Sequence, residues 1–242
     1  MLNLTEYQRR SAQLADWLPW AGLVASDVVL NKDGSFQRTL RFRGQDLDSA
    51  TQGELVAASA RLNNALRRLG SGWALFIEAE RLAAADYPGS DFPEPLSWLV
   101  DEERRASFEA QSSHFESAYH LTLLYLPPEE SRSRAASLLY EHRTQRGVDW
   151  RERLTAFIVE SDRFFDLLDG LMPELGWLDD GQTLTYLHAT VSTHRQRVGV
   201  PENPFHLDVL LADSPLTTGL APRLGEQHLR VLSVRGFPTS TW

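Results

Sequence analysis

The sequence predicts an α+β fold, with a largely antiparallel sheet opened by a β-hairpin and with amphipathic helices packed on that sheet. Two runs of strand-forming residues flank a turn sequence in residues 28–44, and helical apolar periodicity recurs in later segments. The elements alternate without the regular rhythm of a doubly wound parallel sheet. With 242 residues, 42% of them hydrophobic, the chain can bury a sizeable core, and we expect a single domain over residues 1–242.

The hairpin has the clearest local signal. In the segment VVLNKDGSFQRTLRFRG, Phe36, Leu40 and Phe42 fall on one face of a strand, and polar residues fall on the other. A period of two is typical of a half-buried strand. The Asp33-Gly34 pair supplies the positive φ that a tight connection requires. The segment therefore predicts a β-hairpin whose second strand is buried on one face and solvated on the other.

The remaining elements follow in order along the chain. Thr51 and Glu54 have the spacing of a capping box, which predicts an amphipathic helix from there to Gly70. The other expected elements are a strand over 73–80, a helix over 96–117, a strand over 119–128, a helix from an N-cap at Asp149 to Gly170, a short extended piece before a helix capped at Asp179 or Asp180, and strands over 206–212 and 228–236.

Composition excludes several classes of function. The formal charge of −9 argues against broad, non-specific binding to DNA or to an anionic membrane surface, because both depend on positive potential. No apolar run approaches the roughly 20 residues that span a bilayer, and the N-terminus lacks the pattern of a secretory signal. The absence of cysteine excludes disulfides and thiolate zinc sites. We expect a cytoplasmic chain.

The lysine content decides whether the hairpin turn could be a nucleotide-binding loop. The chain has 23 arginines and a single lysine, Lys32. A P-loop needs a lysine directly after a glycine, in the spacing G-x-x-x-x-G-K-[ST], to reach the β- and γ-phosphates. Lys32 follows Asn31, so this chain contains no Walker A motif. We expect no cofactor in these residues.

The histidines give little support for metal chemistry. The seven histidines form no H-x-x-x-H or H-E-x-x-H pair. His188 and His194 are six residues apart, which would place them on different faces of a helix. His206 and Asp208 could place two ligands on one side of a predicted strand, but a lone pair is a weak signal. No residue is therefore assigned as catalytic, cofactor-binding or metal-binding.

Two alternatives to a non-catalytic module stay open at this point. An independent small enzyme would draw on Glu78, Glu80, His120 and His206, and it requires these side chains to converge in one concave pocket. A local nucleic-acid-binding module on the hairpin would show an affinity that falls steeply with salt.

Aromatic and basic residues near the N-terminus are the candidates for partner binding. Trp17 and Trp20 flank a proline and could lie at a membrane interface, which tryptophan favours, or pack on the protein's own sheet. Lys32, Arg41 and Arg43 place local positive charge on the hairpin of an acidic chain. These five residues are predicted to form a contact surface, although a solvated charged face would give the same arginine pattern.

Seven segments, taken in order, resemble one protein family over nearly the whole chain. They are LADWLPWAGLV, VVLNKDGSFQRTLRFRG, LNNALRRLGSGWALFIEAER, FPEPLSWLVDEERR, YHLTLLYLPP, LTYLHATVS and HLRVLSVRGFP. Together they are similar to the N-terminal region of TrbE-type conjugal transfer ATPases, which belong to the CagE/TrbE/VirB family of type IV secretion motor proteins. None of these segments is a catalytic motif.

The resemblance implies a parent ATPase and a non-catalytic segment. Proteins of the family couple ATP hydrolysis to channel assembly and to transfer of DNA or protein at the cytoplasmic face of the inner membrane. Their Walker motifs, and with them ATP and Mg²⁺, belong to a C-terminal RecA-like domain that the 242 residues do not contain. By resemblance, the partners are inner-membrane subunits of the secretion system and other copies of the ATPase, and the chain is peripheral to the membrane.

Overall fold

The computed structural model of the chain describes residues 13–83, 87, 89, 91–110, 114–127, 150–203, 205–230 and 232. The chain divides into two compact units. Unit 1 comprises Met1–Arg38, Tyr125–Phe157 and Leu178–Trp242, and unit 2 comprises Thr39–Leu124 and Ile158–Trp177. The expectation of a single domain stays a prediction.

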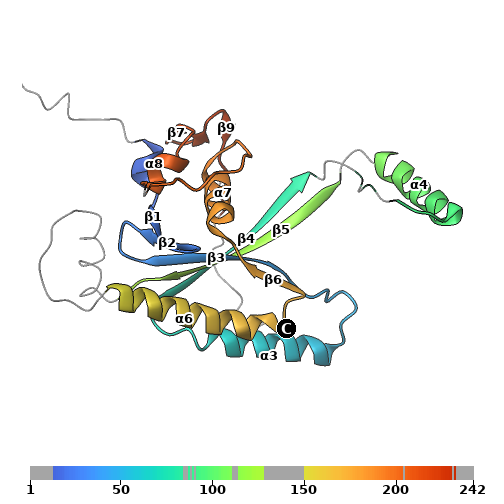
Figure 1. The fold of residues 1–242 in the computed structure, drawn as a ribbon, viewed down its shortest axis with the longest axis horizontal. Coiled ribbons are helices and arrows are strands. Elements are labelled where there is room, and N and C mark those ends of the chain that lie inside the picture. The colour runs from blue at the N-terminus through green and yellow to red at the C-terminus, as the bar shows by residue number, and fades with distance from the viewer. Residues whose placement is uncertain are drawn as a thin grey trace, which may run out of the picture. The chain divides into compact units, whose positions relative to one another are not determined.

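Figure 1 shows the helices and strands of the described residues. The helices are α2 (Leu14–Trp17), α3 (Gln52–Leu66), α4 (Pro95–Ala110), α6 (Trp150–Asp169), α7 (Asp180–Val191) and α8 (Leu207–Leu211). The strands are β1 (Trp20–Ala25), β2 (Val28–Asn31), β3 (Phe36–Arg43), β4 (Trp73–Ala83), β5 (Phe115–Tyr125), β6 (Glu174–Trp177), β7 (Leu216–Thr217), β8 (Arg223–Leu224) and β9 (Gln227–His228).

The main sheet has the strand order β1-β2-β3-β5-β4, and β6 pairs with β3 off this path. The pairs β1/β2, β2/β3 and β3/β6 are antiparallel. A second, small sheet has the order β7-β8-β9 and is also antiparallel. The predicted α+β class with an antiparallel sheet is confirmed.

The predicted hairpin is present as β2 and β3. Leu30 pairs with Phe36, and Val28 pairs with Arg38. The turn closes with a 2.9 Å hydrogen bond from the Gly34 amide to the Asn31 carbonyl, and Gly34 has a φ of 83°. A β-branched or bulky residue is strained at such a φ, so the glycine is required there.

The expected alternation of burial is wrong for the first half of the hairpin. All four residues of β2 are buried, as are Gln37 and Arg38, which were expected on a solvated face. Both faces of these strands are covered within unit 1, because Val29 belongs to a core with α7 and α8, and Phe36 stacks on Phe157 of α6. Exposure begins at Arg41.

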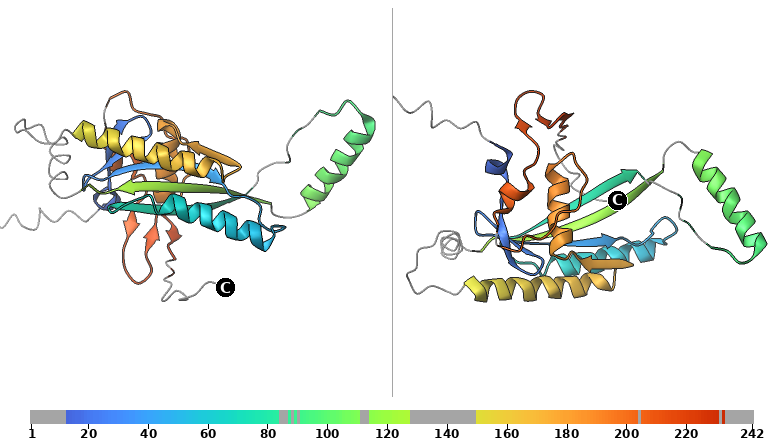
Figure 2. Two further views of the ribbon diagram at one scale, coloured as in Figure 1. Left: turned by 90° about the horizontal axis from the view of Figure 1, so that it is seen from below. Right: turned by 45° about the horizontal axis from the view of Figure 1, so that its top comes forward.

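Each unit has its own hydrophobic core. Unit 1 buries Leu14, Leu18, Trp20, Val29, Leu184, Leu187, Leu207, Leu211 and Leu224 together. Unit 2 buries Leu40, Ala65, Leu121, Leu123, Phe164, Leu168 and Leu171 together. In unit 2, helices α3 and α6 lie on the same face of the sheet, as both orientations in Figure 2 show. Full burial of each leucine contributes roughly 1.5–3 kcal/mol.

Three element predictions are wrong in type or extent. Residues 207–211 form helix α8 instead of a strand. Helix α4 ends at Ala110, and the residues from Phe115 onward, which were expected to end this helix, begin β5. The last predicted strand is represented by β9, which has only two residues, while residues 231 and 233–236 lie outside the described residues, as does the predicted cap Asp149.

Candidate functional site

Lys32 is held inside unit 1 by two contacts. Its ammonium nitrogen lies 2.7 Å from Asp208 Oδ2 on α8, and it donates a 2.9 Å hydrogen bond to the carbonyl of Ala15 on α2. The Asp208 side chain is only 15% exposed, against 39% for Lys32. The turn lysine therefore fastens the hairpin to two helices, and its charge is balanced within the unit.

The two tryptophans that were predicted to form a contact surface differ sharply in exposure. Trp17, at the end of α2, is 64% exposed, whereas Trp20, at the start of β1, is 6% exposed and belongs to the core of unit 1. The expectation that both are exposed is wrong for Trp20. Leu14 and Leu18 on either side of Trp17 are buried, so the indole of Trp17 is presented outward from an anchored segment.

The two arginines of the hairpin are exposed, as predicted, and belong to unit 2. Arg43 forms a 3.1 Å ion pair with Glu174 on β6, and both side chains are more than half exposed. Arg41 pairs in register with Gly176, which has no side chain. The five predicted contact residues are thus divided between the units, with Trp17, Trp20 and Lys32 in unit 1.

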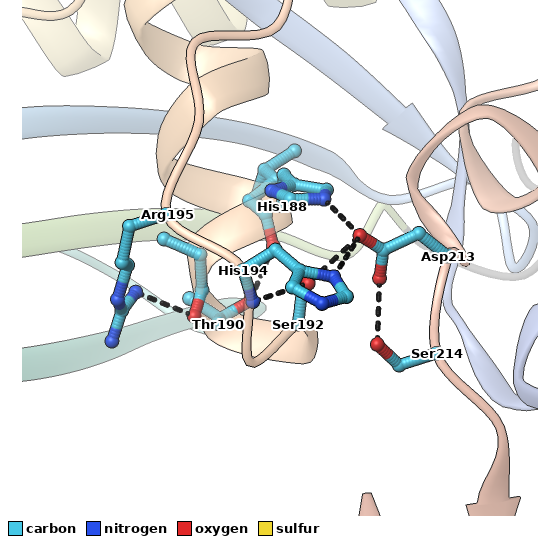
Figure 3. Close-up of polar contacts among 9 residues, drawn as sticks. His188, Thr190, Ser192, His194, Arg195, Asp213 and Ser214 are labelled. Carbon is cyan, nitrogen blue, oxygen red and sulfur yellow. Dashed lines mark hydrogen bonds and ion pairs between the residues drawn. The ribbon is translucent and has the colours of Figure 1, made fainter. Parts of the chain in front are cut away.

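A polar cluster around Asp213 joins the end of α7 to the segment after α8 (Figure 3). Asp213 Oδ2 lies 2.8 Å from His188 Nε2 and 3.3 Å from His194 Nδ1, and it accepts a 2.9 Å hydrogen bond from the Ser192 hydroxyl. Its Oδ1 accepts a 2.9 Å hydrogen bond from the Ser214 hydroxyl. Four groups therefore converge on one carboxylate.

Sequence patterns did not predict this cluster, and they separated its two histidines. Helix α7 ends at Val191, so His194 lies beyond the helix, and the backbone turns it back toward Asp213. The amide of His194 donates a 3.0 Å hydrogen bond to the Ser192 hydroxyl oxygen, which fixes this turn. The expectation that the histidines diverge on different helix faces is wrong, because only His188 is helical.

The geometry of the Asp213 cluster is that of a structural clasp. In a nucleophilic triad the serine hydroxyl donates to a histidine, whereas here Ser192 donates to the carboxylate. Burial raises the pKa of Asp213, but the hydrogen bonds from Ser192, His188, Ser214 and His194 outweigh burial and hold that pKa well below its ordinary value. The clasp is therefore built around an ionised carboxylate. Among the described residues, no group of three or more His, Cys, Asp or Glu side chains could hold a metal ion.

Comparison with known proteins places the chain in a family. The profile described as type IV secretion system ATPase VirB4/TrbE, N-terminal domain, matches residues 27–133. A protein described as the first segment of TrbE, for conjugal transfer, from Sinorhizobium fredii is 40% identical over 141 residues, which cover 57% of this chain and 95% of that protein. The chain belongs to the VirB4/TrbE family of type IV secretion proteins.

Longer relatives of the VirB4/TrbE family match more of the chain. The conjugal transfer protein TrbE of Rhizobium radiobacter is 30% identical over the whole chain, and the chain spans about a third (32%) of that protein. The type IV secretion system protein virB4 of Brucella suis is 25% identical over 182 residues, and the match spans 21% of that protein. These similarities identify the chain as the N-terminal part of a TrbE-type conjugal transfer ATPase.

The family profile covers part of the candidate site. Lys32, Arg41 and Arg43 lie within the matched residues 27–133, while Trp17 and the Asp213 cluster lie outside them. No helix among the described residues has both the length and the apolar character needed to cross a bilayer.

The residues considered for an enzymatic site do not all come together. Burial lowers the pKa of His120 on β5, Glu78 and Glu80 on β4 act to raise it, and Arg41 acts to lower it, so these four side chains of unit 2 sense one another. His206 is the N-cap residue of α8 in unit 1. Three of the four predicted residues are thus neighbours, on the face of the sheet opposite to Leu121 and Leu123, which pack against α3 and α6.

Proposed function

We propose that this chain is the docking and assembly domain of a type IV secretion ATPase for conjugal transfer, and that it does not hydrolyse ATP by itself. The observation that carries the proposal is the position of its single lysine. In a chain of the VirB4/TrbE family, Lys32 occupies a hairpin turn and binds Asp208 and the Ala15 carbonyl. No lysine remains that could reach a phosphate in the P-loop manner.

The proposal assigns the remaining tasks of the family to other parts of the machine. ATP and Mg²⁺ are used by a downstream RecA-like domain of the full-length protein. The present residues hold the ATPase at the cytoplasmic face of the inner membrane through inner-membrane subunits of the secretion system, and other copies of the ATPase assemble with it. The similarity to TrbE of Rhizobium radiobacter, of which this chain spans 32%, supports this division.

The contact surface that we propose is centred on Trp17. Its indole is 64% exposed on an anchored helix, and tryptophan is among the residues that most often dominate binding energy at protein interfaces. Trp20 supports this surface from the core. Arg41 and Arg43 form a second, separate contact, because they belong to the other unit.

ATP turnover tests the division of labour. Purified 242-residue chain and a version extended through the downstream domain are compared for ATP binding and hydrolysis. Binding and turnover only in the extended protein are expected. Turnover by the 242 residues alone would mean that a nucleotide site exists without a P-loop, and the proposal of a non-catalytic module would be abandoned.

A binding measurement with detergent-solubilised inner-membrane subunits of the same secretion system tests the surface. Trp17→Ala is expected to weaken the complex by about 2 kcal/mol or more if Trp17 is a dominant contact. The matched control is Trp98→Ala, because Trp98 is 53% exposed on α4 of unit 2. Circular dichroism establishes that both variants remain folded. Equal affinity for wild type and Trp17→Ala would refute the proposed surface.

A further inference from the structure

A groove in unit 1 lies along β1, away from the Asp213 cluster. It has a volume of about 350 Å³, at the small end of the range of about 300–1,000 Å³ typical of ligand sites. One wall consists of residues 22–25 of β1, and the other consists mainly of residues 200–203 and Phe205. All of these residues belong to unit 1.

The groove follows the backbone edge of β1. Side chains of a strand alternate between two faces, so a groove on one face would be lined by every second residue. Here four consecutive residues, Gly22, Leu23, Val24 and Ala25, line it. β1 is the terminal strand of the main sheet, and its described pairing partner is β2. An edge strand offers unpaired N–H and C=O groups to an incoming chain.

The opposite wall combines exposed apolar groups with negative charge. Val200 is 47% exposed and Phe205 is 51% exposed. Asp180 and Glu202 are the charged residues among the described lining residues, and no basic residue stands among them. Within the described part of the chain, Glu202 has no ion-pair partner, and its side chain is exposed. The groove thus complements a ligand with apolar and cationic groups.

We propose that this groove binds an extended segment of a partner protein, which adds to the edge of β1 as a further strand and carries arginine or lysine beside apolar side chains. The main chain of the segment pairs with β1, its apolar side chains contact Val200 and Phe205, and its cations meet Glu202 and Asp180. The inference rests on the proposed docking function, since it gives the chemistry of one partner.

The same observations disfavour the other macromolecular occupant. A nucleic acid would bring phosphates next to Asp180 and Glu202, and the net charge of −9 adds further repulsion. Like charges that meet across an interface suppress binding of the wrong partner. A basic extended peptide gains from both the charge and the free strand edge.

Fluorescence anisotropy with synthetic peptides and the full 242-residue chain tests the inference. The probe is a labelled peptide in which arginine and valine alternate. Three comparison peptides are one with glutamine in place of arginine, one of the same composition with arginines and valines in separate blocks, and one with N-methyl groups on alternate backbone nitrogens. The alternating peptide is expected to bind at least about tenfold more tightly than each of the others, a difference of about 1.4 kcal/mol.

Charge reversal in the groove separates specific binding from general attraction to an acidic protein. Glu202→Arg is expected to weaken binding of the alternating peptide about tenfold. The matched control is Glu109→Arg, because Glu109 is an exposed glutamate on α4 of unit 2 and lies outside the groove. This control is expected to change affinity by less than about twofold, since exposed charges beyond about 10 Å are largely screened by salt.

The outcomes distinguish this inference from the proposed function. Equal affinity for wild type and Glu202→Arg, or equal binding of the blocked or N-methylated peptide, overturns strand addition at β1. Neither result affects the experiment with Trp17, whose failure would overturn the proposed contact surface. If Glu202→Arg weakens the peptide but leaves subunit binding unchanged, the groove serves a partner other than those subunits, and the link to the proposed docking function is overturned.

Discussion

The ammonium group of Lys32, in the turn of the β2–β3 hairpin, is bound by the carboxylate of Asp208 on helix α8 at 2.7 Å. The two residues are 176 positions apart in the sequence, so this contact closes a large part of unit 1. Lys32 also donates to the Ala15 carbonyl, which brings α2 into the same junction. The residue that first suggested a nucleotide loop is therefore a fastening point of the fold.

A double-mutant cycle measures how strongly this junction stabilises the fold. With Lys32→Met and Asp208→Asn, we expect a coupling free energy of about 1 kcal/mol in urea unfolding, at the upper end for partly exposed pairs. The Arg163–Glu160 pair is the matched control, because its side chains are 68% and 50% exposed, and its coupling is expected to be about 0.3 kcal/mol. A coupling no larger than that of the control contradicts the fastening role.

The turn between β1 and β2 gives a second prediction. Asp27 has a φ of 58° and its Oδ2 binds Arg38 at 2.8 Å, with both side chains less than 15% exposed. Asp27→Ala leaves this buried guanidinium without that carboxylate and keeps the strained backbone, so it should destabilise by about 3 kcal/mol. Asp27→Gly removes the strain and should destabilise by about 1 kcal/mol less.

Denaturant unfolding of both variants checks this difference. The control is the same pair of substitutions at Asp91, an exposed residue that is not among those with positive φ. Glycine should offer no advantage over alanine at that position. Equal stabilities of Asp27→Ala and Asp27→Gly would show that the left-handed backbone is not a source of strain.

The sequence predicted those parts of the fold that depend on near neighbours. The Thr51 capping box is present, with a 2.7 Å hydrogen bond from the Thr51 amide to Glu54 Oε2, and Asp179 caps α7 in the same way with Gln182. Such signals span only three residues, and chain geometry makes them nearly independent of the tertiary fold. The turn at Gly34 is predictable for the same reason.

Contacts between distant segments were not predictable in this way. The short apolar run at 207–211 suits a strand or a helix equally, and it is the burial of Leu207 and Leu211, four residues apart, that makes it helical. Asp213 lies 25 residues from His188, and no local pattern joins them. Exposure of Trp17 and burial of Trp20 likewise depend on where α2 and β1 pack.

The Asp213 clasp predicts a dependence of stability on pH. Because the pKa of Asp213 is lowered in the folded state, its ionised form stabilises the protein above the ordinary aspartate pKa of about 3.9, and that contribution is lost as pH falls below this value. Asp213→Asn should therefore cost about 2 kcal/mol at pH 7. The gap between variant and wild type should narrow progressively on acidification below about pH 4.

Urea unfolding of both proteins from neutral pH to about pH 3 checks the Asp213 prediction. His188 and His194 also contact this carboxylate, so the comparison is repeated with His194→Gln, which removes the more exposed of the two imidazoles. In that background the gap should keep the same sign. A gap between Asp213→Asn and its parent that is constant across the whole range would contradict an ionised clasp.

His120 provides a prediction of similar sign from a different cause. Burial lowers its pKa most strongly, against the attraction of Glu78 and Glu80 and with the repulsion of Arg41. As pH falls through the ordinary histidine range near about 6.5, the unfolded chain therefore takes up a proton more readily than the folded protein, and stability decreases. His120→Gln should lose less stability than wild type on acidification from pH about 7.5 to about 5.5. Glu78→Gln should deepen the loss, because it removes an attraction that favours the imidazolium, whereas Arg41→Gln should reduce it. Titration of the His120 imidazole by NMR in the three proteins with His120 intact gives an independent order of pKa values, with Glu78→Gln lowest and Arg41→Gln highest. The reverse order would show that the charged residues on β3 and β4 do not face His120 across this side of the sheet.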